Sequence, residues 1–406
     1  MKSTNNIYKL EGRIQHYAWG GFTFLPELLQ VPNVGNKPFA EYWMGAHSKA
    51  PSLITLHNDE KISLDEYLGE SSSELLGSNT VKNFSRLPYL FKILDVKDML
   101  SIQVHPTKQN AVLEFEAENK KGISIDDPSR NYKDDNHKPE LMYALSDFWL
   151  LHGFKTAEKL KNILAAVPEL NFLQPVFDKE GYTGLYRFVM ELPQDEVNTR
   201  LQPLLDRIVP LYEKEMLPKS DENFWAARAA ITFNEPGRID RGIFSIYIFN
   251  LVNLQQGEAI FQDAGIPHAY LEGQNVEIMA NSDNVLRGGL TPKHIDVPEL
   301  LKHTKCEPLV PVVIAGKPSG NDDEQVFLTP AADFELRLIN VAAPGTVKIP
   351  VKTADIFFVY NGRVRVGGTS GFDREAGEAF LATSGAEVSI TSTVNAIVFR
   401  ATVPGA

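Results

Sequence analysis

The chain has 406 residues, of which 43% are apolar and 23% are charged, and these proportions are typical of a soluble globular protein. A chain of this length is longer than a domain built around one hydrophobic core, so two or three domains are predicted. The formal net charge of −12 argues against nonspecific binding to nucleic acid. A small anionic substrate would therefore need lysine and arginine side chains gathered at its own site.

Cysteine usage and hydropathy indicate the compartment. Cys306 is the only cysteine, so no internal disulfide can form, and a reducing cytoplasm is expected. Met1 to Gly20 contains no apolar run long enough for a signal peptide. No stretch approaches the roughly 18 apolar residues of a membrane span. We therefore expect a cytoplasmic protein with no membrane partner and no nucleic-acid partner.

The first third of the chain has mainly strand and turn patterns. Residues 1–60 contain short segments that are rich in aromatic side chains. Ser63 and Glu66 have the spacing of a capping box, which predicts a short helix. The apolar run 89–96 predicts a strand, and the polar break after it predicts a hairpin with the next strand. Residues 108–121 have a helical pattern. This part is therefore expected to be mainly β.

The pattern changes from strand to helix near Phe154. Between residues 156 and 235 apolar side chains recur at helical spacing, and Pro203 and Pro210 are expected to kink or divide one helix. The strand pattern returns from about residue 241, beginning with an expected strand over 244–254. A helical domain is therefore predicted between two groups of strands. The predicted domains are residues 1–155 together with 236–325, residues 156–235, and residues 326–406.

A weak repeat links the two β-rich parts of the chain. Gly257-Glu-Ala259 recurs as Gly377-Glu-Ala379, and both copies precede a strand–turn–strand pattern. The repeat predicts a second barrel of related design at residues 326–406. Val388 stands where the first copy has His268. We therefore expect the C-terminal barrel to hold no metal.

The stretch Leu100–Lys108 alternates between apolar and polar side chains, as a strand does. Its polar face carries Ser101, Gln103 and His105. A strand inside a barrel presents metal ligands in this way, although a solvated strand face is the commoner origin of such a short pattern. Pro106 ends the strand because it has no amide proton for the ladder.

Four residues form a candidate metal site: Gln103, His105, Glu140 and His268. Imidazole, carboxylate and amide oxygen suit zinc or another borderline divalent ion. Two ligands two residues apart, a carboxylate on a later strand and a histidine after a Gly-x-Pro turn resemble the cupin arrangement. His137 is an alternative ligand. The four together favour a metal, because a coincidence would have to recur on three strands.

Groups suited to a phosphorylated sugar lie near this candidate site. Lys138 is expected on the same strand face as Glu140. Arg287 follows a polar turn and precedes Gly288 and Gly289, where the backbone can come close to a ligand. Arginine and lysine that converge on one pocket bind phosphate well. The expected substrate-binding residues are Ser101, Tyr270, Lys293 and Lys92.

Several longer motifs narrow this hypothesis. They are Glu41–His47, Leu100–Pro106, Tyr132–Glu140, and Pro267–Tyr270 with Asn281–Arg287. These stretches resemble the type I phosphomannose isomerases, a family of cupin-class zinc enzymes. The resemblance covers about residues 7–300, and the C-terminal third matches weakly. One departure is Ser48, where the family more often has proline.

The resemblance implies a fold and a cofactor. The fold would be mainly β with an α-helical insertion, containing a metal-binding catalytic cupin (jelly-roll) barrel and a C-terminal metal-free barrel. One Zn²⁺ per chain would be bound by the residues that match the family ligands, and Arg287 would be catalytic. The residues that match the family ligands are Gln103, His105, Glu140 and His268.

The implied reaction interconverts D-mannose 6-phosphate and D-fructose 6-phosphate through an enediol. A general base must reach both carbons, and Glu277 and Lys138 are the candidates. The residues alone leave two other classes open. These are a metal-dependent cupin oxygenase and a noncatalytic cupin that binds a sugar phosphate. A monomer is expected.

Overall fold

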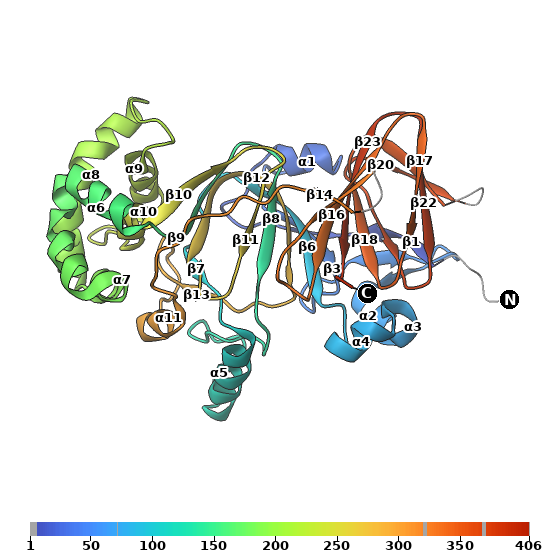
Figure 1. Cartoon of the computed structure of the whole chain (residues 1–406), viewed down its shortest axis with the longest axis horizontal. Coiled ribbons are helices and arrows are strands. Elements are labelled where there is room, and N and C mark those ends of the chain that lie inside the picture. Colours follow the sequence, from blue (N-terminus) through green and yellow to red (C-terminus); the bar gives the residue numbers. More distant parts are fainter. Residues whose placement is uncertain (1–5, 71, 320–322, 368–370, 406) are drawn as a thin grey trace.

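The computed structural model describes residues 6–70, 72–319, 323–367 and 371–405. Its strands form three sheets, and a cluster of helices lies at one end of the molecule (Figure 1). The predicted class, a mainly β protein with a helical segment, is confirmed. Within the described ranges, no helix is long and apolar enough to cross a membrane.

A ten-stranded sheet joins the segments that precede and follow the helices. Its central strand is β12 (His268–Ala280), which pairs with β6 (Tyr89–Val96), β7 (Gln103–Val104), β8 (Glu140–Ala144) and β9 (Phe148–Phe154). The other members are β2 (Arg13–Gln15), β3 (Glu41–Gly45), β10 (Phe249–Leu254), β11 (Ala259–Gln262) and β13 (Leu286–Arg287).

Strand β12 changes partners in its middle. Its register against β9 ends at Glu272, and its register against β6 begins at Gly273, which has a φ of 129°. A Cβ at Gly273 would lie 2.6 Å from Cδ2 of Phe148, so only glycine fits there. Because one strand serves both halves of the sheet, side chains from both halves converge on it.

The predicted hairpin between residues 89–96 and the strand of Gln103 is wrong. Both edges of β6 are already occupied, one by β12 and the other by β3. Strand β7 pairs instead with β12 and β13. In the segment between β6 and β7, Leu100 N–H donates to the carbonyl of Tyr270 at 2.9 Å. This bond directs the segment toward β12 and away from β6.

The helical segment packs on the outer end of this sheet (Figure 1). Its helices are α6 (Ala157–Ala166), the short 3₁₀ helix η1 (Pro168–Leu173), α7 (Gln174–Glu191), α8 (Gln194–Glu213), α9 (Glu222–Phe233) and α10 (Gly242–Ile248). Helix α8 continues through Pro203 and Pro210, and the non-helical residue lies in α7 at Gly181.

The strand expected over 244–254 is wrong in its first half. Residues 242–248 form α10, and β10 begins only at Phe249. Every residue of α10 is buried, so its apolar run has no exposed face. Hydrophobic periodicity cannot separate a fully buried helix from a fully buried strand.

The C-terminal strands form two further sheets. One holds β14 (Lys317–Pro318), β15 (Glu324–Phe327), β16 (Glu335–Val341), β18 (Asp355–Asn361), β21 (Ala379–Ala382) and β23 (Ala396–Thr402). The other holds β17 (Gly345–Pro350), β19 (Arg363–Val366), β20 (Phe372–Glu375) and β22 (Glu387–Ser392). A core that includes Phe357, Phe380 and Val398 lies among these strands.

The first of these sheets also contains strands from the start of the chain. They are β1 (Ile7–Glu11), β4 (Leu53–Thr55) and β5 (Lys61–Ser63). Strand β1 pairs with β21 on one side and with β4 on the other. This crossing of the chain was not predicted, and it ties the N-terminal segment to the C-terminal part of the molecule.

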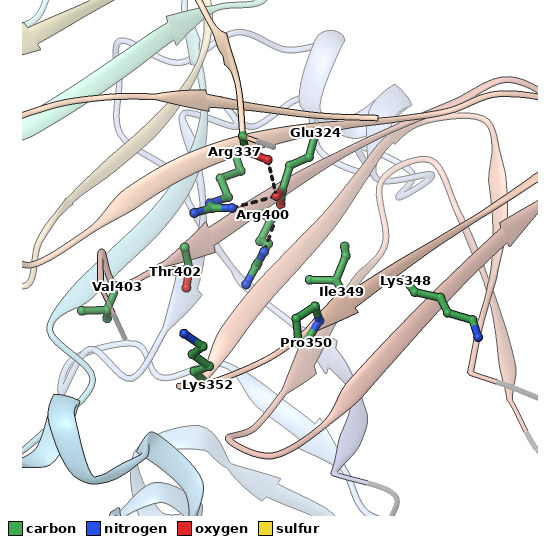
Figure 2. Close-up of a pocket in the computed structure, with 11 residues that line it drawn as sticks. Glu324, Arg337, Lys348, Ile349, Pro350, Lys352, Arg400, Thr402 and Val403 are labelled. Atoms are coloured by element: carbon green, nitrogen blue, oxygen red, sulfur yellow. Dashed lines mark hydrogen bonds and ion pairs between the residues drawn. The ribbon is translucent and has the colours of Figure 1, made fainter. Parts of the chain in front are cut away.

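A buried network of ion pairs crosses the nine-stranded sheet (Figure 2). The Arg400 guanidinium donates to Asp355 Oδ2 at 2.8 Å and to Glu324 Oε1 at 3.0 Å. Arg337 donates to the other oxygen of Glu324 at 2.7 Å. Glu324, Arg337 and Arg400 border a cavity of about 390 Å³. Because the two arginines are engaged by carboxylates, the network connects strands β15, β16, β18 and β23.

The described residues form six further helices outside the sheets, of which α5 projects away from them (Figure 1). They are α1 (Phe24–Leu28), α2 (Leu64–Glu70), α3 (Ser72–Leu76), α4 (Ser78–Phe84), α5 (Lys108–Lys120) and α11 (Val297–His303). The predicted helix after Ser63 is confirmed as α2, and the predicted helix over 108–121 is confirmed as α5. Thr107 caps α5 by accepting a hydrogen bond from Asn110 N–H.

Candidate metal centre and substrate pocket

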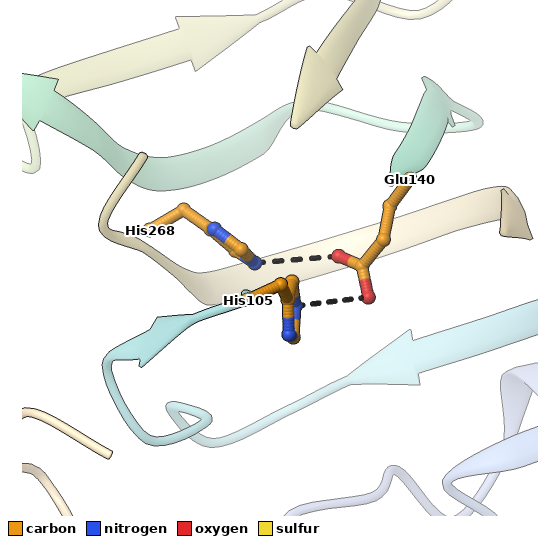
Figure 3. Close-up of side chains that lie close together, drawn as sticks. All are labelled: His105, Glu140 and His268. Atoms are coloured by element: carbon orange, nitrogen blue, oxygen red, sulfur yellow. Dashed lines mark ion pairs between the residues drawn. The ribbon is translucent and has the colours of Figure 1, made fainter. Parts of the chain in front are cut away.

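Three metal-binding side chains meet at the point where β7, β8 and β12 approach one another. His105 Nε2 lies 3.4 Å from Glu140 Oε1, and His268 Nε2 lies 3.3 Å from Glu140 Oε2. Figure 3 shows the two imidazoles directed at the two carboxylate oxygens. All three residues are buried. Gln103 joins them, because its Cα pairs with that of His268 in the sheet and both residues line one small cavity.

Backbone carbonyls fix which nitrogen of each imidazole carries hydrogen. His105 Nδ1 lies 2.8 Å from the carbonyl oxygen of Asn284, and His268 Nδ1 lies 3.0 Å from that of Ile266. A carbonyl only accepts, so each Nδ1 is the donor, and this leaves Nε2 of each ring as the atom that can bind a metal at the centre. Burial lowers the pKa of His105 to about 4, which keeps this imidazole neutral near pH 7.

This arrangement fits a zinc ion. His105 Nε2 is buried and has no hydrogen-bond partner among the described residues. Its lone pair faces a carboxylate, and the two groups attract each other only through a cation placed between them. Burial by itself would raise the pKa of Glu140, but the Lys138 ammonium, 3.0 Å away, holds that pKa well below its ordinary value. Two imidazoles and an ionised carboxylate suit Zn²⁺.

The predicted alternative ligand, His137, lies elsewhere. Its Nε2 is 2.9 Å from Asp333 Oδ2, in the connection between β15 and β16. It forms no part of the group of His105, Glu140 and His268, whose potential ligand atoms all lie within 4.8 Å of one another.

A second buried polar chain runs beside the metal centre. Glu277 Oε1 accepts a hydrogen bond from Lys92 Nζ at 2.9 Å, and Glu277 Oε2 accepts one from the Tyr270 hydroxyl at 2.9 Å. Glu41 lies 3.6 Å from Lys92 on its other side and accepts a hydrogen bond from the Trp43 indole. Burial raises the pKa of Glu277, although the Lys92 charge opposes this shift. Lys92 and the Tyr270 hydroxyl therefore fix both oxygens of the Glu277 carboxylate beside the metal centre.

A cavity of about 710 Å³ opens onto both groups. A smaller space of about 50 Å³ continues toward the metal centre and is bordered by Glu140, His268, Tyr270 and Glu277. The predicted site residues on the larger cavity are Ser101, Gln103, Lys138, Lys92, Arg287 and Lys293. The structure thus brings every predicted site residue to one of these two spaces except His105, which lies behind them against Glu140.

Comparison with known proteins agrees with this geometry. Residues 7–157 match the family model for the catalytic domain of type I phosphomannose isomerase. Mannose-6-phosphate isomerase from Salmonella typhimurium is 38% identical over 361 residues, which span 88% of this chain and 89% of that protein. The human enzyme is 30% identical over 391 residues, spanning 88% of each. The chain belongs to the type I phosphomannose isomerase family.

Solved structures of phosphomannose isomerases share the whole fold. A crystal structure of a mutant of the Salmonella typhimurium protein has a TM-score of 0.88 at 33% identity, covering 98% of this chain and 99% of that one. A zinc-bound mannose 6-phosphate isomerase structure has a TM-score of 0.86 with the same identity and coverage. The predicted family resemblance and cupin fold are therefore confirmed.

Some residues that border the larger cavity were not predicted. Asp283 lies 2.7 Å from Lys49 Nζ and 3.3 Å from His47 Nε2, and its hydrogen bonds with these two side chains hold its pKa below the ordinary value even though burial would raise it. Asp283 and Lys49 border the larger cavity, as does Lys133. The motifs Glu41–His47 and Asn281–Arg287 contained the signal, but sequence spacing alone gave no reason to pair them.

Proposed function

We propose that the chain interconverts D-mannose 6-phosphate and D-fructose 6-phosphate through an enediol, at one Zn²⁺ held by Gln103, His105, Glu140 and His268. The observation that carries this proposal is the buried His105–Glu140–His268 group, which adjoins a cavity bordered by lysine and arginine. Zinc, when bound, supplies a Lewis acid that polarises a carbonyl or holds two hydroxyls.

The proton moves between C2 and C1 of the sugar, so one base must serve both carbons. Glu277 and Lys138 both border the space next to the metal centre. A raised pKa makes the Glu277 carboxylate the stronger base, and its bond from the Tyr270 hydroxyl offers a path for a hydroxyl proton. Lys138 is already engaged by Glu140 at 3.0 Å. These contacts favour Glu277 as the base, with Lys138 as the alternative.

Cationic groups that border the larger cavity suit the rest of the substrate. Arg287 is placed to stabilise the oxyanion that develops as the carbon-bound proton leaves. Lys293 borders the same cavity and supplies a second cation for the phosphate. Ser101, Lys92 and Tyr270 complete the proposed contacts with the sugar.

The test is a coupled assay of mannose 6-phosphate conversion, before and after chelation and again after zinc is restored. Activity should disappear with the metal and return with it. His105→Ala should lose stoichiometric zinc while keeping the fold, and His137→Ala, the matched control, should retain both zinc and activity. Substrate that binds the loaded protein and stays unchanged would identify a noncatalytic cupin. Oxygen uptake would identify an oxygenase.

We infer that the protein is cytoplasmic, because its single cysteine, Cys306, suits a reducing compartment, and we propose that it is a monomer. We also propose residues 1–155 with 236–325 as the catalytic domain, 156–235 as the helical domain and 326–406 as the C-terminal domain. Strands β1, β4 and β5 are then the part of the catalytic segment that packs with the C-terminal domain. Sedimentation at several protein concentrations tests the monomer.

A further inference from the structure

One buried carboxylate outside the cavity holds the loop that follows Arg287. Asp240 lies between α9 and α10 and is 8% exposed. Its Oδ1 accepts hydrogen bonds from the backbone N–H groups of Gly242 at 2.7 Å and Leu290 at 2.8 Å. Its Oδ2 accepts a third from Thr291 N–H at 3.1 Å. A single side chain thereby joins the start of α10 to the loop 288–293.

The part of the loop that Asp240 grips is strained. Leu290 has a φ of 55°, a conformation that residues other than glycine rarely adopt, and its side chain is buried. Such a backbone persists only where its surroundings hold it in place. Asp240 binds the N–H of Leu290 and the N–H of the next residue, so it holds the backbone on both sides of the strained Cα.

The loop is also packed tightly between two neighbours. A Cβ at Gly289 would lie 2.4 Å from Gly242 Cα, so the loop and α10 are in direct backbone contact. On the opposite side, Gly288 N–H donates to Ile102 O at 2.8 Å, and Ile102 N–H donates to Gly289 O at 3.0 Å. The loop is therefore fixed by the strand of Gln103 on one side and by Asp240 on the other.

This loop positions two cations. Arg287 immediately precedes it, Lys293 ends it, and both border the larger cavity. Burial and the neighbouring Arg287 charge lower the pKa of Lys293, so the two groups are close enough to repel each other. Because the two like charges repel each other, a firmly held backbone helps to keep them together at the cavity. Asp240 does not itself border the cavity.

We propose that Asp240 is a positioning residue, which fixes the loop 288–293 so that Arg287 and Lys293 converge on the phosphorylated substrate. This proposal rests on the proposed function, since it assigns Arg287 and Lys293 to the same site. It also gives the helical segment a part in the reaction, because Asp240 follows α9 and its carboxylate anchors α10 to the loop.

The first test is Asp240→Asn, which keeps the side-chain size but removes the charge and leaves Thr291 N–H facing an amide nitrogen or no acceptor. We expect kcat/KM for mannose 6-phosphate to fall by a factor of about 10–10², because small misplacements of catalytic groups have effects of this size. Zinc content and far-ultraviolet circular dichroism should be unchanged. Asp355→Asn, a buried carboxylate in the C-terminal sheet, is the matched control, and it should lower the melting temperature without lowering kcat/KM.

A double-mutant cycle with Arg287→Ala separates positioning from general damage. If Asp240 acts through Arg287, Asp240→Asn should lower kcat/KM by less than about 3-fold in the Arg287→Ala background, since the effects of coupled sites are not additive. An equal loss in both backgrounds would overturn the proposal, as would unchanged kinetics of Asp240→Asn. If Arg287→Ala alone has no effect, the proposed function of Arg287 fails instead.

Should Asp240→Asn yield too little folded protein, Asp240→Glu provides the same test. It keeps the charge and moves the carboxylate by one methylene. A lower kcat/KM with full zinc content is expected, and kinetics equal to those of the unchanged chain would overturn the proposal.

Discussion

The position of one hydrogen atom decides what His105 can bind. His105 Nδ1–H donates a hydrogen bond to the carbonyl of Asn284, so the lone pair of the ring is on Nε2, which faces Glu140 in a buried space. Strand alternation predicted that Gln103 and His105 share a face, but it could not identify Asn284 as the partner, nor show that His137 bonds to Asp333. Such contacts depend on loops that meet only in the folded chain.

Arg287 allows a residue-scale test of mechanism. A guanidinium has no lone pair for a metal, so Arg287→Ala should leave zinc in place. If it stabilises charge that develops in the transition state, kcat and kcat/KM should fall together by about 10²–10³. Steady-state kinetics with metal analysis make the measurement. A rise in KM at constant kcat would mean that Arg287 only grips the phosphate.

Arg287→Lys separates charge from geometry, because lysine keeps the charge and loses the planar fork of donors. A kcat/KM for Arg287→Lys between those of Arg287→Ala and the unchanged chain would indicate that charge alone contributes. Kinetics of Arg287→Ala equal to those of the unchanged chain would remove Arg287 from the site and leave Lys138 and Lys293 as the cations.

At the scale of elements, helix α11 is anchored by one carboxylate. Glu299 accepts hydrogen bonds from the Tyr132 hydroxyl at 2.7 Å and from His303 Nε2 at 2.8 Å. Lys302, on the same helix, also pairs with Glu114 of α5. Burial by itself would raise the pKa of Glu299, but His303 and Tyr132 lower it to about 2. The anchor therefore depends on the ionised form of Glu299.

This anchor should respond to acid. The folded pKa of about 2 lies below the unfolded value of about 4.3, so the stabilisation is complete above that value and is lost as pH falls toward 2. Glu299→Gln should lower the melting temperature near neutral pH and reduce its dependence on pH between about 4 and 2. Thermal melts across this range test the prediction, with the exposed Glu307→Gln as the control. Parallel melting curves for Glu299→Gln and the unchanged chain would contradict it.

Elements with a strong local pattern were predictable, and elements defined by burial were not. Helix α5 has a capping threonine and a terminal glycine near its ends, so its limits followed from sequence. Helix α10 is apolar on every side, and nothing in its sequence separates it from the strand that follows it. The partner of β6 was also missed, because a long central strand such as β12 can displace a neighbour in sequence.

At the scale of the whole molecule, the C-terminal sheet is tied together by Arg400. Arg400→Met would leave Asp355 and Glu324 buried without their main cation. Removing one partner from a buried ion pair typically costs about 3–5 kcal/mol. We therefore expect a loss of that order in the free energy of unfolding, measured with a chemical denaturant.

The kcat of Arg400→Met should be unchanged wherever the protein is folded, because Arg400 does not border the catalytic cavity. Arg363→Met breaks only exposed pairs, with Asp373 and with Glu375, and should change stability far less. Equal losses for both variants would mean that burial of the Arg400 network contributes nothing.

The place of β1 has a consequence for the newly made chain. Strand β1 is made long before its partner β21, because β1 ends at Glu11 and β21 begins at Ala379. At about 5–20 residues per second, synthesis of the intervening chain takes on the order of 20–70 s, and during that time one edge of β1 lacks its partner strand. The sheet therefore closes only after β21 has emerged, and a nascent chain that stalls before that point carries an open strand edge that neighbouring chains can bind.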